Sequence, residues 1–161
     1  MIEGLIQNND IFYVLPILVL FITGLIPITL KLMTGNTERY PFFAMMMTVL
    51  GLLAAGVLLV IYSMFGSEIG VPDHAFHFAL VFDSTSMWIG FLVLAAAAAS
   101  AVVMYENPAT RNRQFSELLF LLCGTSIGML VLVLAADLLM VFVGIETMSL
   151  ALYLLIATSK E

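Results

Sequence analysis

Apolar residues are gathered in five long runs, and most polar and charged residues lie between the runs. The runs cover about residues 11–31, 41–65, 86–105, 116–136 and 137–158. Each is close to the ~20 residues that a helix needs to cross the hydrocarbon core of a bilayer. The sequence lacks the polar and apolar alternation of membrane barrel strands, and within lipid only helices and closed barrels satisfy the backbone hydrogen bonds. The pattern therefore predicts an all-α integral membrane protein with five transmembrane helices.

The composition agrees with this pattern. Of the 161 residues, 63% are hydrophobic and 10% are charged, and the mean hydropathy is +1.15. Soluble globular domains carry about 45–50% apolar and about 25% charged residues, so a soluble domain is excluded. We expect residues 1–161 to form a single transmembrane helical region in the lipid bilayer, with no nucleic acid as a partner. The single cysteine, Cys123, lies in an apolar run, which leaves neither a disulfide framework nor a cysteine metal site.

The basic residues lie in three places that alternate with segments free of them. They are Lys31 and Arg39, Arg111 and Arg113, and Lys160. With five spans, these three places lie on one side of the membrane, and the positive-inside rule assigns that side to the cytoplasm. The sequence therefore predicts an N-terminus outside and a C-terminus inside. The net charge of −6 then reflects scarce basic residues rather than an acidic binding surface.

The segment 66–86 is the longest one between the predicted spans, and it falls on the predicted outer side. Residues 74–82 alternate aromatic and other side chains, which favours a short hairpin between the second and third helices. Asp83, followed by three hydroxyl-bearing residues, has the pattern of a helix start. His74 and His77 invite a metal site, but no third ligand is clustered with them in the sequence. We therefore expect no metal there.

Glu146 is the one carboxylate in the middle of a predicted span, which makes it the leading candidate for chemistry. It lies two residues from the centre of the stretch 138–158, or roughly 3 Å from the bilayer midplane at about 1.5 Å of rise per residue. A charged side chain there costs about 2.5–3.5 kcal/mol on insertion scales, and intramembrane ionisable groups usually mark proton or ion pathways. Because low polarity favours the neutral acid, we interpret Glu146 as a proton relay. The alternative is a permanently protonated side chain that only joins helices by hydrogen bonds.

The tight turn near Ala136 indicates what surrounds Glu146. Residues ten positions before and after this turn lie at similar depth, which places Thr125 and Ser126 at the level of the carboxylate. Ser149, three residues after Glu146, lies on the same side of the helix. These three hydroxyl groups are supporting candidates, and helix rotation decides whether they face the carboxylate. No Lys, Arg or His lies deep in any of the five runs, so we infer that a cationic partner comes from other helices.

The stretch 115–161 resembles a known family. It contains Phe-Ser-Glu-Leu-Leu-Phe, then Gly-Met-Leu-Val-Leu-Val-Leu-Ala-Ala-Asp-Leu-Leu, then Gly-Ile-Glu-Thr-Met-Ser-Leu-Ala-Leu-Tyr-Leu-Leu. These runs are similar to the N-type antiporter-like subunit of proton-translocating NADH:quinone oxidoreductase, which is respiratory complex I. The related L-type and M-type subunits have Trp just before the glutamate and Pro shortly after it, where this chain has Ile145 and Ser149. Residues 1–114 resemble the family in helix spacing, outer loop and predicted orientation.

The resemblance implies a function and a set of partners. By position, Glu146 is the essential glutamate of the family's fifth helix, which pairs with a lysine on the seventh helix that is not in this chain. The implied function is that of a non-redox membrane-arm component that couples electron transfer from NADH to quinone to proton translocation in a bacterial inner (plasma) membrane. The implied partners are the other membrane-arm subunits and the remaining helices of the N-type subunit, from the sixth onward. This chain would then be a fragment or split first piece of a longer subunit, or a truncated gene product, and inactive alone. NADH, FMN, iron–sulfur clusters and quinone would belong to other parts of the complex.

Two other interpretations stay open at this point. One is a structural or assembly membrane protein in which Glu146 only joins helices. The other is a subunit of a related cation/proton antiporter or membrane-bound hydrogenase. Replacement of Glu146 by Gln distinguishes the structural role from the proton relay, because Gln keeps hydrogen bonds but carries no exchangeable acid proton. The run Gly-Ile-Glu-Thr-Met-Ser favours the N-type subunit over the second.

Overall fold

The computed structural model describes residues 11–34, 41–71, 74–76, 78–108 and 114–158. The described part consists of long helices and one small hairpin. In chain order these are α1 (Ile11–Thr34), α2 (Pro41–Ile69), β1 (His74–Ala75), β2 (Leu80–Val81), α3 (Ser84–Glu106), α5 (Phe115–Leu134) and α6 (Leu138–Thr158). Five helices within the described residues are long and apolar enough to cross a membrane. The predicted all-α membrane architecture is confirmed.

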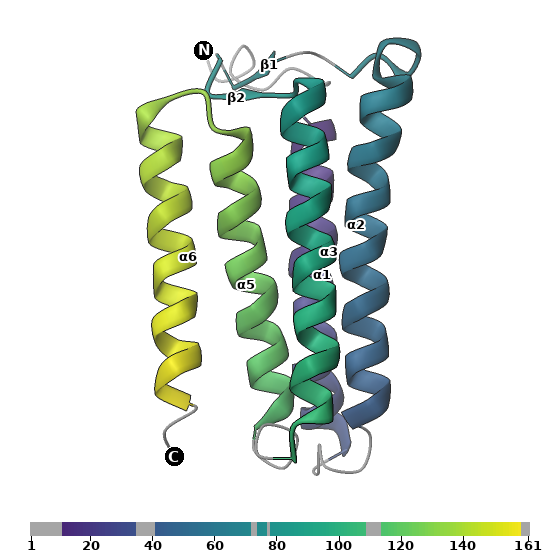
Figure 1. The fold of residues 1–161 in the computed structure, drawn as a ribbon, viewed down its shortest axis with the longest axis vertical. Coiled ribbons are helices and arrows are strands. Elements are labelled where there is room, and N and C mark those ends of the chain that lie inside the picture. Colours follow the sequence, from purple (N-terminus) through teal and green to yellow (C-terminus); the bar gives the residue numbers. More distant parts are fainter. Residues whose placement is uncertain (1–10, 35–40, 72–73, 77, 109–113, 159–161) are drawn as a thin grey trace.

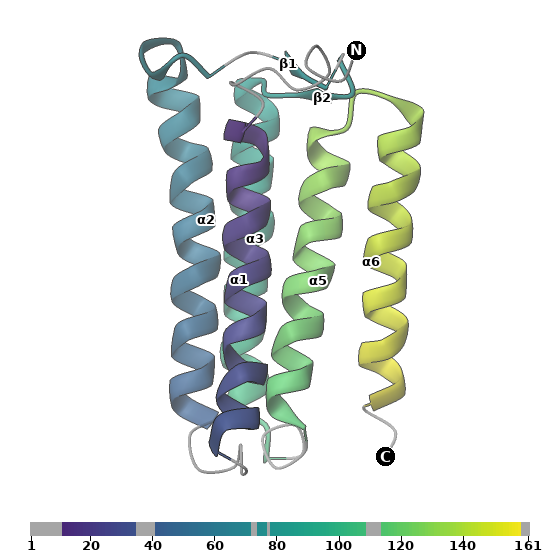
Figure 2. The same cartoon turned by 180° about the vertical axis from the view of Figure 1, so that it is seen from behind.

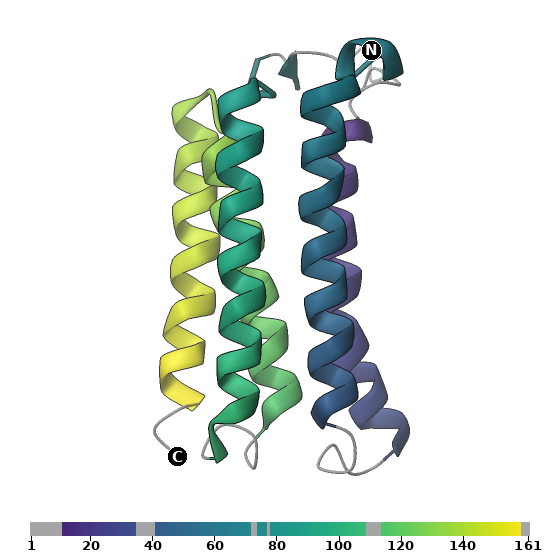
Figure 3. The ribbon, with the colours of Figure 1, turned by 45° about the vertical axis from the view of Figure 1, so that its right-hand side comes forward.

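The helices stand side by side as one bundle, with α2 at one edge and α6 at the other (Figures 1 and 2). α5 is central to the packing, because it contacts α1, α2, α3 and α6, while α2 also packs against α1 and α3. Figure 3 shows α6 on the side of the bundle away from α1 and α2. Since α6 has α5 on one side only, 11% of its span is buried, compared with 50% of the α5 span. Most of the α6 surface is therefore uncovered in this bundle.

One of the five basic residues can be placed at an end of the bundle. The hairpin and the turn between α5 and α6 lie at one end, here called the outer end, and the last turns of α1, α3 and α6 lie at the other, the inner end (Figure 1). Lys31 lies in the last turn of α1 and thus at the inner end. The other four basic residues fall outside the described residues, so the assignment of the inner end to the cytoplasm stays a prediction.

The predicted hairpin lies at the outer end, where it also contacts the turn between α5 and α6. β1 and β2 pair antiparallel, with His74 opposite Val81. Leu80 forms a further antiparallel bridge with Ala135, and the Ala136 amide donates to the carbonyl of residue 79 at 3.0 Å. The start of α6 is therefore fixed to the loop that precedes α3. His77 lies outside the described residues, so the absence of a metal at the two histidines stays a prediction.

Two helix ends at the outer side carry recognisable end signals. Asp83 caps α3, since its Oδ1 accepts a hydrogen bond from the Ser86 amide at 3.1 Å and another from the Ser86 hydroxyl. The side-chain hydrogen bond from Ser86 is the main cause that lowers the pKa of the Asp83 carboxyl group below its ordinary value. Gly70 follows α2 with φ +81°, and the amides of Gly70 and Val71 each donate to the Gly66 carbonyl at 2.9 Å. A left-handed glycine ends helices in this way, which explains why α2 stops four residues beyond its predicted apolar run.

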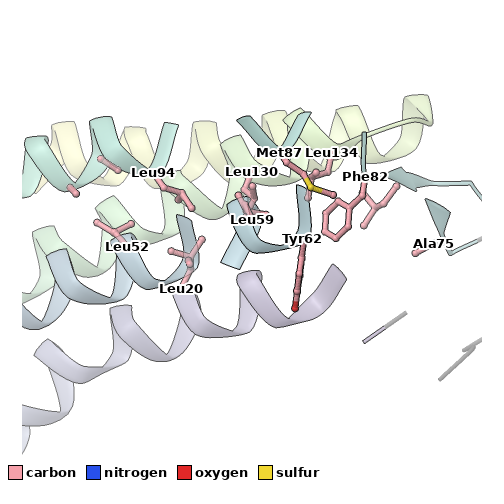
Figure 4. Packing of buried hydrophobic residues seen from close by; sticks show 14 residues of the cluster. Leu20, Leu52, Leu59, Tyr62, Ala75, Phe82, Met87, Leu94, Leu130 and Leu134 are labelled. Carbon is pink, nitrogen blue, oxygen red and sulfur yellow. The ribbon is translucent and has the colours of Figure 1, made fainter. Parts of the chain in front are cut away.

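The core lies between α1, α2, α3 and α5, and Figure 4 shows the buried cluster that extends from these helices to the hairpin. Its fully buried leucines come from all four helices and include Leu20, Leu52, Leu59, Leu94 and Leu130. Toward the outer end, Tyr62 is 5% exposed and packs between Phe12 and Phe82, with ring centroids 5.9 and 6.0 Å away. In a bilayer such contacts stabilise through van der Waals packing rather than through removal of apolar surface from water.

Candidate functional site

The backbones of α5 and α6 approach each other closely at two glycines, Gly128 and Gly144. A Cβ atom built on Gly128 would lie 2.5 Å from the Met148 amide nitrogen and 3.0 Å from the Gly144 carbonyl oxygen. A Cβ atom built on Gly144 would lie 3.0 Å from the Leu132 amide nitrogen and 3.1 Å from the Gly128 carbonyl oxygen. The two backbones therefore touch with no room for a side chain between them, which is the use that membrane helices make of small residues.

Glu146 lies on the opposite side of α6 from this contact. The buried residues of α6 are Gly144 and Ala151, and both face α5. Glu146 is two residues from Gly144, and at about 100° per residue the two positions are roughly 160° apart around the helix. In agreement, the Glu146 side chain is exposed in this bundle. The carboxylate is thus directed away from α5 and away from the core.

Glu146 is the polar centre of an otherwise apolar stripe, here called the open face of α6. The stripe also contains large side chains that are 64%, 62%, 59% and 69% exposed, namely Leu139, Phe142, Leu150 and Tyr153. By helical geometry these residues fall within roughly 80° of the helix circumference. Apolar side chains suit either lipid or another helix, but a carboxylate at this depth does not suit lipid. The open face is therefore a surface that another protein segment is expected to cover.

Of the three hydroxyl groups predicted to support Glu146, the two on α5 lie away from it and Ser149 lies beside it on α6. Thr125 and Ser126 are buried on α5 and donate to the carbonyls four residues earlier on their own helix, at 2.9 and 2.8 Å. Because Gly128 lies against the segment 144–148, these two residues are closer to the level of Ser149 than to that of Glu146. Ser149 is half-buried and roughly 60° around the helix from Glu146. Within the described residues no hydrogen bond joins Glu146 to any of the three, and the structure does not bring the α5 hydroxyls to the carboxylate.

No cation faces Glu146 in the described part of the chain. Lys31 is the single Lys or Arg there, and its Nζ donates to the Glu117 Oε1 at 2.7 Å. This ion pair joins the inner ends of α1 and α5, with side chains 33% and 39% exposed. Glu117 is on the order of 18 Å from the level of Glu146 along the helix axis. The described residues also contain no cluster of His, Cys, Asp and Glu suited to a metal ion.

Comparison with known proteins gives relatives that share one name. A Bdellovibrio bacteriovorus protein, "NADH-quinone oxidoreductase subunit N", is 46% identical over 153 residues, which are 95% of this chain and 30% of that protein. A Leptospira interrogans protein of the same name is 28% identical over 154 residues, which are 94% of this chain and 29% of that protein. This chain belongs to the subunit N family. No family model and no solved structure matches it.

The subunit N relatives confirm and extend the resemblance seen at residues 115–161. A further relative, from Trichlorobacter lovleyi, is 20% identical over 160 residues, which are 99% of this chain and 31% of that protein. The likeness to subunit N thus includes the first three helices, for which the sequence pattern alone offered only helix spacing, the outer loop and the predicted orientation. The chain spans about 30% of the length of these curated relatives.

Two features of this chain were not among the sequence-based candidates. Gly128 and Gly144 stand eight residues before and after Ala136, so the tight turn that indicated the depth of Glu146 also places these two glycines opposite each other. The same count would have identified the contact. The pair of Lys31 and Glu117 had no comparable signal, because nothing local in the sequence shows that α1 and α5 are neighbours.

Proposed function

We propose that this chain forms part of a subunit N that couples electron transfer from NADH to quinone to proton translocation, with Glu146 as an intramembrane proton relay. The observation that carries the proposal is the position of Glu146, near the middle of α6 and on the face that no described helix covers. The printed name of the subunit N relatives supports the electron transfer from NADH to quinone, and the five apolar helices support the membrane setting.

The exposed carboxylate implies a partner for α6. An ionised side chain left in hydrocarbon costs about 2.5–3.5 kcal/mol, and the described residues offer Glu146 no hydrogen bond or cation to offset that cost. The relatives are about three times as long as the region that matches this chain, so they contain segments that can pack on the open face. We propose that the further helices of subunit N cover Glu146 and that one of them brings a lysine to it.

Such a pair gives the carboxyl group two states. A lysine ammonium close to Glu146 favours the ionised carboxylate, whereas separation of the two in a medium of low polarity favours the neutral acid. If a conformational change alters this distance, the carboxyl group takes up one proton in one state and releases it in the other. Glu146 then moves a proton without any change in oxidation state, which suits a non-redox subunit.

The redox chemistry is assigned to other parts of the complex. We propose that NADH, FMN, the iron–sulfur clusters and quinone are bound by other parts of the complex, because iron–sulfur clusters need several cysteine ligands and this chain has one cysteine, Cys123. Activity would belong to the whole assembly, with the other membrane-arm subunits as partners. The proposed location is the inner membrane of a bacterium, as a multi-pass protein.

The structure offers little support for Glu146 as a residue that only joins the helices of this bundle. It faces away from α5 and forms no hydrogen bond across a helix interface within the described residues. The relatives named above are all called subunit N, which favours this subunit over a separate antiporter or hydrogenase component.

The test is NADH-driven proton pumping in membranes that carry Glu146→Gln in the complete complex, with assembly checked on a native gel. The matched control is Glu106→Gln, which removes an exposed carboxylate at the inner end of α3. We expect normal assembly and sharply reduced pumping for Glu146→Gln, and wild-type pumping for the control. Wild-type pumping by assembled Glu146→Gln would refute the relay. If the Gln variant does not assemble, Glu146→Asp serves instead, because it keeps the carboxylic acid. An Asp variant that assembles and pumps would support the proposal. An Asp variant that assembles without pumping would count against it.

A further inference from the structure

The direction of Glu146 is set by the packing of α6 against a single neighbour. α5 is the one helix in substantial contact with α6 within the described residues. The two buried residues of α6, Gly144 and Ala151, both belong to that contact. Within the described residues, no second helix packs as extensively against α6. The side of α6 that meets α5 therefore decides where its opposite side, with Glu146, is directed.

The space available for an added Cβ atom differs along the interface between α5 and α6. At Gly128 an added Cβ would lie 2.5 Å from a backbone nitrogen, which requires the two helices to move apart. At Gly144 the nearest backbone atoms would be 3.0 Å away, which requires a shift of a few tenths of an ångström. At Gly124 the nearest atom would be the Ala151 Cβ at 3.6 Å, an ordinary contact that requires no shift. Three glycines on one interface thus predict three different responses to the same added methyl group.

We propose that Gly128 and Gly144 are positioning residues that hold Glu146 in the direction needed for proton transfer. This inference rests on the proposed function of Glu146. Backbone contact at these two positions fixes both the separation of α6 from α5 and its rotation. Neither glycine touches the proton, so each acts through the carboxylate. Proton transfer needs donor and acceptor within about 2.6–3.2 Å, and a misplacement of about 1 Å can cost on the order of 100-fold in rate.

The experiment compares Gly124→Ala, Gly144→Ala and Gly128→Ala in the complete complex in native membranes. Proton pumping per electron transferred is measured across a range of pH. In the same membranes, a hydrophobic carbodiimide is reacted with the carboxyl groups, and its addition to Glu146 is quantified by mass spectrometry at each pH. Carbodiimides react with the protonated carboxyl group, so the labelling midpoint reports the surroundings of Glu146 directly and does not require pumping.

We expect Gly124→Ala to behave as wild type in both measurements. Gly144→Ala should shift the pH midpoint of Glu146 labelling and lower pumping by about tenfold, and Gly128→Ala should do both to a greater extent, up to about 100-fold in pumping. A merely structural role would lower the amount of assembled complex and leave the midpoint unchanged. The order of the three variants follows from the backbone distances alone.

Wild-type labelling midpoints in Gly144→Ala and Gly128→Ala would overturn the proposal, whether or not pumping falls. Labelling is measured on the inserted chain, so a variant that assembles poorly still gives a result. Failure of the relay proposal can be told apart from failure of the positioning proposal. If Glu146→Gln pumps normally, the relay is refuted, whereas if Glu146→Gln stops pumping and the glycine variants keep the wild-type midpoint, the relay stands and the positioning role is refuted.

Discussion

A methyl group added at Gly51 is expected to separate α1 from α2. Thr23 on α1 is 4% exposed, and its hydroxyl donates to the Val19 carbonyl at 2.7 Å. A Cβ atom on Gly51 would overlap the Oγ1 and Cγ2 atoms of Thr23 and would lie 2.7 Å from its Cβ atom. Real Cβ atoms essentially never approach so closely, so either the helices move apart or Thr23 leaves its buried position and its hydrogen bond.

The expected cost follows from two opposing effects. Overpacking of a filled interface typically costs about 1–3 kcal/mol. Replacement of a helical glycine by alanine returns up to about 1 kcal/mol through helix propensity. We therefore expect Gly51→Ala to lower the free energy of unfolding by about 1–2 kcal/mol, which is a factor of about 5–30 in the unfolding equilibrium. Addition of Thr23→Ala removes two of the three overlapping atoms and should recover part of this loss.

The assay uses Cys123, which is 1% exposed on α5, as a reporter of unfolding. The purified protein in detergent micelles is titrated with sodium dodecyl sulfate, and modification of Cys123 by a thiol reagent is followed by mass spectrometry. The matched control is Gly66→Ala on the same helix, where the nearest atom to an added Cβ is the Val71 Cβ at 3.6 Å. The control should be as stable as wild type or slightly more stable. Equal midpoints for Gly51→Ala and Gly66→Ala would show that the packing argument is wrong.

Two further predictions concern the ends of the bundle. Charge reversal at either Lys31 or Glu117 should destabilise the protein, and swapping the two residues should restore its stability. The coupling energy between the two substitutions should be about 0.2–1 kcal/mol and should fall as the salt concentration rises, because both side chains are about one-third exposed. Additive effects in this double-mutant cycle would contradict a stabilising pair. At the outer end, Asp83→Ala should cost about 1 kcal/mol of stability at neutral pH, and Asp83→Asn should cost less because an amide oxygen still caps the helix. Since the pKa of Asp83 is lowered in the folded protein, its contribution is present above the ordinary carboxyl pKa and is lost as pH falls through the lowered pKa. The Cys123 assay repeated at decreasing pH should therefore show wild type approaching Asp83→Ala, and a constant difference between them would contradict the prediction.

The spans, the hairpin and the position of Glu146 along its helix could be predicted because each depends on residues close together in the chain. Membrane insertion is decided by local hydropathy, so the five apolar runs became five helices with nearly the predicted ends. The cap at Asp83 depends on a hydrogen bond to a residue three positions later. The position of Glu146 near the middle of α6 depends only on where that one helix begins and ends. The subunit N family was also recognisable, because the motif residues lie within one short stretch.

The rotation of α6 was decided only by the tertiary structure. The sequence left open whether Thr125 and Ser126 face Glu146, and the structure places them on α5, on the far side of α6 from the carboxylate. α6 is apolar nearly all the way round, so its sequence marks no side as the buried one. The side that meets α5 is selected where Gly128 and Gly144 let the two backbones touch. The two glycines are sixteen positions apart and lie on different helices. Their contact forms only when the two helices pack together, so neither helix by itself determines it.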